Sequence, residues 1–209
     1  MKTPTVGVAI ASIPPRTKML SQAVLSVEKQ THKVDKVIAI TDYDHEGVST
    51  VRNRAWRALD TDFVFFLDDD DVMYEYHVEK VMKRLLAPDS PDLVYPWFDV
   101  HDPWNRPAFD FLLINGESAE HHPFNDAARA ELETKSNFIP VTVGVKRSML
   151  ELSGGFPQPE TDEWPHEANE DWGCWIRMLR MGAEFAHIPE RTWQWRWHSH
   201  HTMGRPDRW

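Results

Sequence analysis

The 209-residue sequence has one cysteine, Cys174, and no apolar run long enough to cross a membrane. A single cysteine excludes an intramolecular disulfide and a zinc site built from several cysteines, and it favours a reducing compartment. A membrane span needs about 20 apolar residues. The apolar run at 6–13 is shorter, ends in Pro14-Pro15 and lacks a small-residue cleavage pattern, so it is typical of a strand. We therefore expect a cytoplasmic protein without a membrane span.

Basic residues are fewer than acidic ones: the sequence has 23 Lys and Arg and 33 Asp and Glu, which gives a net charge of -10. This excess of negative charge argues against a protein that binds nucleic acid through its overall electrostatic field, although the sequence does not exclude a local basic groove. The 41% hydrophobic and 11% aromatic residues indicate a packed globule. The ten tryptophans serve either a core or the stacking of sugars and bases. The length fits one domain, 1–209.

Strands and helices alternate through the first hundred residues. Four apolar runs are typical of strands: 5–12, 36–41, 62–68 and 92–100. Three segments with helical periodicity lie between them: 17–30, 49–60 and 74–87. Strands separated by helices imply βαβ units and a mostly parallel sheet flanked by helices, a Rossmann-like α/β fold. In such sheets, ligands bind beyond the carboxyl ends of the strands.

The second half of the sequence is less regular. Residues 101–124 have no sustained period and contain several Pro, Gly and Asn breakers, which predicts a long irregular segment. After it we expect a helix at 124–135, a strand at 138–145, a second helix at about 170–181 and a closing strand at 191–198. No internal repeat or linker divides the chain, so we predict one domain.

Four consecutive carboxylates, Asp68 to Asp71, follow the apolar run 63–67 in the stretch "DFVFFLDDDDVM". Neighbouring like charges repel, which costs stability unless a cation or solvent neutralises them. Spaced carboxylates offer a hard divalent cation one or two oxygens and leave its other positions to water and substrate phosphates. A solvated acidic turn is the alternative. The position at the end of an apolar strand favours a Mg²⁺ or Mn²⁺ site.

The segment "FLDDDD" resembles the D-x-D motif of family 2 glycosyltransferases, which have the GT-A fold. The resemblance implies that Asp70 holds a divalent metal bridging a nucleotide diphosphate, and that Asp68 contacts the ribose and the metal. The fourth aspartate leaves the register open by one residue. Asp69 and Asp71 therefore stay alternatives, and Asp69 is counted with the donor-binding residues.

Three N-terminal segments extend the resemblance. "VGVAIASIPPR" is similar to the first strand and turn of the family, with Arg16 in the place of its arginine, and "VIAITD" implies that Asp42 contacts the nucleotide base. The following "DYDHEG" departs from the usual continuation, which leaves the base identity open. "GVSTVRNRA" resembles a family segment in which Arg52 and Asn53 open a helix and present donors and a cation to an anion or a base edge.

The segment "NEDWGCWIRMLRMG" resembles the family's E-D helix. Its apolar side chains follow at i, i+3, i+4 and i+7: Trp172, Trp175, Ile176 and Leu179. Asp171 lies in the first turn, off this stripe, where the helix dipole favours the ionised form that a general base needs. The resemblance implies that Asp171 is the base and that Glu170 supports the acceptor or orients its neighbour.

Two further segments match the family. "GGFPQP" resembles the turn before the E-D helix, where Gly154 and Gly155 either permit close approach of an acceptor or form a plain turn. The final "WQWRWHSHHT" alternates a tryptophan face, expected in the core, with a polar face that ends at His198. His198 matches a metal-ligating histidine of the family, and imidazole beside carboxylates suits Mn²⁺. If the segment is aligned with the family motif in a different register, His200 or His201 takes this place.

The motifs together imply a single GT-A domain, with a nucleotide-sugar half at about 1–100 and an acceptor and catalytic half at about 101–209. The implied reaction is metal-dependent, inverting transfer of a sugar, as by a hexosyltransferase, from a nucleotide-diphosphate donor, preferably a UDP-sugar, to an acceptor hydroxyl. The acceptor is a glycan, a protein, a small molecule or, less in keeping with the net charge, a modified DNA base. Two other classes stay open: a metal-dependent nucleotidyltransferase or phosphohydrolase, and a catalytically silent module that binds a nucleotide sugar or glycan.

Overall fold

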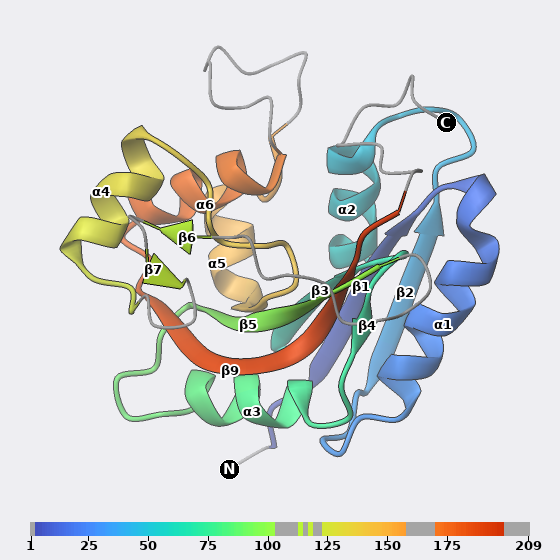
Figure 1. Ribbon diagram of the computed structural model, residues 1–209, viewed down its shortest axis with the longest axis horizontal. Coiled ribbons are helices and arrows are strands. Elements are labelled where there is room, and N and C mark those ends of the chain that lie inside the picture. Colours follow the sequence, from blue (N-terminus) through green and yellow to red (C-terminus); the bar gives the residue numbers. More distant parts are fainter. Residues whose placement is uncertain (1–2, 103–112, 115–116, 119–122, 158–169, 199–209) are drawn as a thin grey trace.

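The computed structural model describes residues 3–102, 113–114, 117–118, 123–157 and 170–198 (Figure 1). The strands in this part of the chain are β1 (Val6–Ser12), β2 (Lys36–Thr41), β3 (Phe63–Asp68), β4 (Val72–Met73), β5 (Leu93–His101), β6 (Leu113–Ile114), β7 (Glu117–Ser118), β8 (Gly144–Lys146) and β9 (Phe185–Arg196). The helices are the 3-10 turn η1 (Pro14–Arg16), α1 (Thr17–Glu28), α2 (Val48–Arg57), α3 (His77–Leu85), α4 (Asp126–Thr134), α5 (Arg147–Ser153) and α6 (Glu170–Arg180).

One mixed sheet has the strand order β2-β1-β3-β8-β5-β9-β4. The parallel pairings of β1 with β2, β1 with β3 and β5 with β9 are long. The antiparallel pairings of β8 with β3 and β5, and of β4 with β9, are short. The sheet is therefore mostly parallel, and Figure 1 shows it curling along β9. The predicted α/β fold is confirmed.

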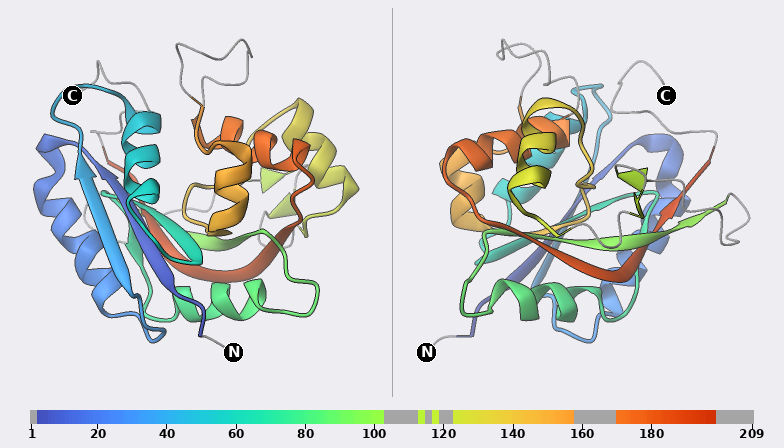
Figure 2. Two further views of the ribbon diagram at one scale, coloured as in Figure 1. Left: turned by 180° about the vertical axis from the view of Figure 1, so that it is seen from behind. Right: turned by 60° about the vertical axis from the view of Figure 1, so that its left-hand side comes forward.

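The alternation of side chains along the strands builds two apolar layers, one on each face of the sheet. In β3, Phe65 and Leu67 pack with α1 and α3, whereas Val64 and Phe66 point to the opposite cluster with α2, α5 and α6. Figure 2 shows α3 on one side of the sheet and α2, α5 and α6 on the other. A strand covered on both faces needs apolar residues at nearly every position, which explains the continuous run that ends at the acidic turn.

The structure differs from the sequence-based expectation in the second half. The strand expected at 138–145 pairs only over Gly144–Lys146, although Ile139, Val141 and Val143 before it are buried in the core. α5 was not predicted; it is short and ends at Gly154, whose φ of 80° gives a left-handed C-cap. β9 begins at Phe185 and not at 191, because the strand continues through Pro189, a residue type that usually interrupts strands.

Two other expectations are met only in part. Most of the segment predicted to be irregular, 101–124, lies outside the described residues, and the short strands β6 and β7 pair within it. The tryptophan face of β9 is core only at its beginning: Trp193 is buried with Trp97, Phe98 and Val100, whereas Trp197 is 52% exposed. None of the helices described here is long and apolar enough to span a membrane.

Candidate active site

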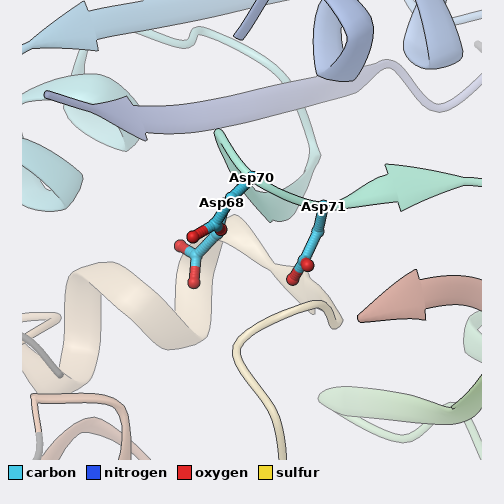
Figure 3. A group of neighbouring side chains, drawn as sticks. All are labelled: Asp68, Asp70 and Asp71. Atoms are coloured by element: carbon cyan, nitrogen blue, oxygen red, sulfur yellow. The ribbon is translucent and has the colours of Figure 1, made fainter. Parts of the chain in front are cut away.

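The acidic turn at the end of β3 brings three carboxylates together. The amide of Asp71 donates a hydrogen bond to the Asp68 carbonyl at 3.2 Å, which closes a tight turn. Asp68, Asp70 and Asp71 each offer an oxygen, and these oxygens lie within 4.8 Å of one another. Figure 3 shows the three side chains leaving the turn on the same side. This spacing lets one ion contact all three carboxylates.

Asp69 points away from this group. Its carboxylate accepts hydrogen bonds from Ser12 Oγ at 2.8 Å, from the Ile13 amide at 3.1 Å and from Arg16 Nη1 at 3.0 Å. Burial and the Asp70 charge raise the pKa of Asp69 to about 6, against the opposing effect of Arg16. Asp69 therefore fastens the acidic turn to the end of β1.

Asp70 is held from two sides by buried side chains. Its Oδ2 lies 2.7 Å from Arg16 Nη1 and 3.1 Å from His198 Nε2. His198 comes two residues after the end of β9, so the closing strand delivers it to the turn. The structure thus brings together Asp70 and His198, the two residues predicted as metal ligands. The alternatives His200 and His201 lie outside the described residues.

Burial and mutual repulsion disfavour the ionised forms of Asp68 and Asp71. Burial, followed by the charges of Asp70 and Asp68, raises the pKa of Asp71 well above its ordinary value, although Asp71 Oδ1 accepts the Arg196 amide at 3.0 Å. Burial also raises the pKa of Asp68, opposed by Arg52. Crowded buried carboxylates, with an imidazole beside them, match the ligands of a divalent cation such as Mn²⁺. The side chains present fit the predicted metal.

Arg52 connects the acidic turn to the beginning of α6. Its Nη2 donates to Asp68 Oδ1 at 2.6 Å and its Nη1 donates to Glu170 Oε1 at 2.7 Å, while only 6% of the Arg52 side chain is exposed. Burial lowers the pKa of Arg52, but the charges of Asp68 and Glu170 outweigh it and raise this pKa. The ion pairs place the D-x-D and E-D motifs in one site.

Asp171 occupies the first turn of α6 beside Glu170. Its Oδ1 accepts the amide of Trp172 at 2.7 Å. Burial, and then the charge of Glu170, raises the pKa of Asp171 to about 7, although Arg52 and the Trp172 amide lower it. This direction is opposite to the one expected from the helix dipole alone, because burial and a neighbouring carboxylate outweigh the dipole. A pKa near neutrality suits a general base.

Asn53 has a structural partner that the sequence did not indicate. Its side chain donates to the Phe156 carbonyl at 2.7 Å and accepts the Phe156 amide at 3.0 Å. Gly155 has a φ of 77°, and a Cβ there would lie 2.6 Å from Asn53 Oδ1. The glycine turn therefore docks on α2, and the donors of Asn53 serve the turn itself.

Asp42 holds the loop between β2 and α2. Its two carboxylate oxygens accept the amides of Glu46 and Gly47, both at 2.9 Å, and its own amide donates to the Ser12 carbonyl at 2.8 Å. The side chain thus shapes the loop whose sequence departs from the family pattern. Its contact with a nucleotide base stays a prediction.

Two contributors to the site were missed by the sequence reasoning. Ser12 donates to Asp69, and Arg196 contacts the turn through its amide on Asp71 and through Nε on the Asp70 carbonyl. A lone serine at a strand end carries no signal. The position of Arg196 on the polar face of β9, two residues before His198, was the one available indication.

Comparison with known proteins agrees with this arrangement. The model of the glycosyl transferase family 2 matches residues 40–152, more than half of the sequence, and the chain belongs to this family. The glycosyltransferase class expected from the motifs is thereby confirmed. No curated protein sequence gives a significant match to the chain.

Solved structures of S. aureus TarS have the same fold. TarS 1–349 in complex with UDP has 13% sequence identity and a TM-score of 0.62, over 92% of this chain and 60% of that one. The complex with UDP-GlcNAc has 12% identity and a TM-score of 0.66, over 95% and 60%. A longer TarS structure has 12% identity and a TM-score of 0.62, over 91% and 36%. The chain spans about three fifths of TarS 1–349 and about one third of the longer TarS structure. The likeness establishes the fold.

Proposed function

We propose that the protein transfers a sugar from a nucleotide-diphosphate donor to an acceptor hydroxyl, with a divalent cation and with inversion at the anomeric carbon. One observation carries the proposal: Arg52 joins Asp68 of the acidic turn to Glu170 at the start of α6, so that the two family motifs face one site. Family membership supports glycosyl transfer. The UDP and UDP-GlcNAc complexes of TarS support a UDP-sugar as the first donor to test.

The cation side consists of Asp70 and His198, with Asp68 and Asp71 within reach of the same ion. Bound there, a divalent cation would supply Lewis-acid assistance to the departing diphosphate. The protein's own part is to hold these groups in place: Arg196 fixes Asp71, and the ion pair with Arg52 fixes Asp68.

The base side consists of Asp171 and Glu170. In the transfer, the acceptor oxygen forms a bond to the anomeric carbon while the bond from that carbon to the donor phosphate oxygen breaks, and its electron pair leaves with the diphosphate. The acceptor proton passes to Asp171. The raised pKa of Asp171, about 7, makes its carboxylate basic enough to take this proton near neutral pH. Glu170, held by Arg52, orients the start of the helix.

The remaining predicted donor-binding residues are engaged with the protein: Arg16, Asp42 and Asp69. We propose that they shape the donor site, since each one fixes a segment at the carboxyl end of a strand. Arg16 and Asp69 hold the end of β1 to the acidic turn, and Asp42 folds the loop after β2. The acceptor remains one of the classes expected from the sequence.

The test is release of nucleoside diphosphate from a panel of nucleotide sugars, beginning with UDP-GlcNAc, with and without Mn²⁺ or Mg²⁺. We expect metal-dependent release from one donor, and a loss on the order of 10² to 10⁴ in rate for Asp171→Asn. Asp70→Asn should lose the metal-dependent release. Asp89→Asn, which alters an exposed carboxylate paired with Arg84, is the matched control.

The outcomes separate the competing classes. Release of pyrophosphate or inorganic phosphate instead of nucleoside diphosphate would establish a nucleotidyltransferase or phosphohydrolase. Thermal stabilisation by a nucleotide sugar without cleavage, even with a panel of acceptors, would indicate a silent binding module. If no nucleotide stabilises or is cleaved by the protein, the proposed function is wrong.

A further inference from the structure

The Asp70 carboxylate, one of the three at the proposed cation site, already has a cationic neighbour. Arg16 Nη1 lies 2.7 Å from Asp70 Oδ2, and His198 Nε2 lies 3.1 Å from the same oxygen. The exposed fractions of the side chains are 10% for Arg16, 7% for Asp70 and 6% for His198, so water screens these charges weakly.

Arg16 has a second anchor outside the cation site. The same Nη1 lies 3.0 Å from Asp69 Oδ1, and the other oxygen of Asp69 is fixed by Ser12 Oγ and the Ile13 amide. Arg16 itself ends the 3-10 turn η1 that follows β1. The guanidinium is therefore shared between one carboxylate that belongs to the site and one that points away from it.

A divalent cation and Arg16 compete for this geometry. A cation such as Mg²⁺ approaches a carboxylate oxygen to about 2.1 Å. A guanidinium at hydrogen-bond distance from the same carboxylate would then stand within a few Å of the ion, where like charges in a buried site repel strongly. Asp69 gives the guanidinium a carboxylate to keep when Asp70 turns to the cation.

We infer that Arg16 is the built-in counter-ion of Asp70 in the cation-free protein, and that a divalent cation displaces it from Asp70 while Asp69 retains it. The inference rests on the proposed function, since it takes the cation site of that proposal as given. It assigns Arg16 a role in setting the affinity for the metal. The acidic turn then binds a cation more weakly than its carboxylates alone would.

Direct binding of Mn²⁺ tests the inference without any turnover. The electron paramagnetic resonance signal of free Mn²⁺ would be followed as purified protein is added, for the wild type, Arg16→Gln, Asp70→Asn and Arg84→Gln. Arg84 pairs with Asp89 at the surface, so its substitution changes the net charge equally but leaves the site intact. We expect Arg16→Gln to bind Mn²⁺ about tenfold more tightly, because a repelling unit charge is removed. Arg84→Gln should match the wild type, and Asp70→Asn should lose binding.

The contrary outcomes are distinct. If the wild type binds Mn²⁺ and folded Arg16→Gln binds it equally or more weakly, the inference fails and the cation site stands. If neither binds Mn²⁺, or Asp70→Asn binds like the wild type, the proposed metal site fails and the inference falls with it. Should Arg16→Gln not fold, a Mg²⁺ titration of the wild type decides. The assigned Nη resonances of Arg16 should shift as the ion binds, and unchanged resonances at saturation would overturn the inference.

Discussion

Replacing Asp171 by Asn is expected to slow sugar transfer and, at alkaline pH, to stabilise the fold. Burial and the charge of Glu170 raise the pKa of Asp171 in the folded protein to about 7, from an ordinary 3.8. Because the folded pKa lies above the unfolded one, the contribution of this carboxyl group to stability is complete below pH 3.8 and is lost as the pH rises through 7. A neutral Asn avoids that loss and can still accept the Trp172 amide.

The size of the effect follows from the two pKa values. A shift from 3.8 to about 7 corresponds to at most about 4 kcal/mol of destabilisation above pH 8, at about 1.4 kcal/mol per pKa unit. This shift already includes the attraction of Arg52, but the Asp171 side chain is only partly buried and water screens its charge, so we expect a gain of about 2 kcal/mol. The advantage over the wild type should grow from about pH 4 to about pH 7 and then level off.

Urea unfolding of the wild type and Asp171→Asn at several pH values between about 4.5 and 8.5 measures this difference. Asp126→Asn, in the first turn of α4, is a matched control for the loss of an acidic residue at a helix start, and it should lose a few tenths of a kcal/mol. An advantage that does not change with pH, or a variant less stable at pH 8.5, would refute the electrostatic reasoning. Turnover near the wild-type rate would refute the assignment of the base.

Four further substitutions test ion pairing, burial and backbone conformation in the protein. Arg52→Met should lower the free energy of unfolding by about 2 kcal/mol in chemical denaturation, since it removes a buried guanidinium from two partly buried carboxylates, Asp68 and Glu170; a loss below about 1 kcal/mol would contradict this. Burial lowers the pKa of His77 to about 3, so stability should fall as the pH drops below 6.5, and His77→Phe should lose about 2 kcal/mol less than the wild type between pH 7 and 5; equal losses would argue against a buried neutral imidazole. Gly155→Ala should cost about 3 kcal/mol and Gly154→Ala about 1 kcal/mol in urea unfolding, because both have positive φ but only the Cβ at 155 would clash with Asn53; equal costs would place the strain in the backbone alone.

The sequence was informative where structure is local. Periodicity located β1, β2, β3 and the helices between them. The acidic turn was recognised as a candidate site because ligands bind beyond the carboxyl ends of parallel strands. The E-D helix was predictable because its apolar stripe and first-turn acids lie within one segment. The strand expected at 138–145 was mostly wrong, because burial of alternate residues does not require a pairing partner.

The side-chain contacts within the site were not predictable from the sequence. Arg52 and Glu170 lie 118 positions apart, and no local pattern links them. Four identical aspartates gave no indication that Asp69 would turn to β1 while its neighbours face the site. The raised pKa of Asp171 depends on burial and on charges brought by folding, which a helix start alone does not report.

The strand order has a consequence for the making of the protein. β9 pairs with β5 and β4, which a ribosome completes about 90 and about 120 residues earlier, and His198 and the Arg196 amide reach the acidic turn only with β9. Pairing across such a separation is slow compared with closing a local hairpin. During synthesis the crowded aspartates therefore stand at an unfinished edge without these partners. The proposed cation site is therefore complete only once residues 185–198 have joined the sheet, long after the acidic turn itself has been synthesised.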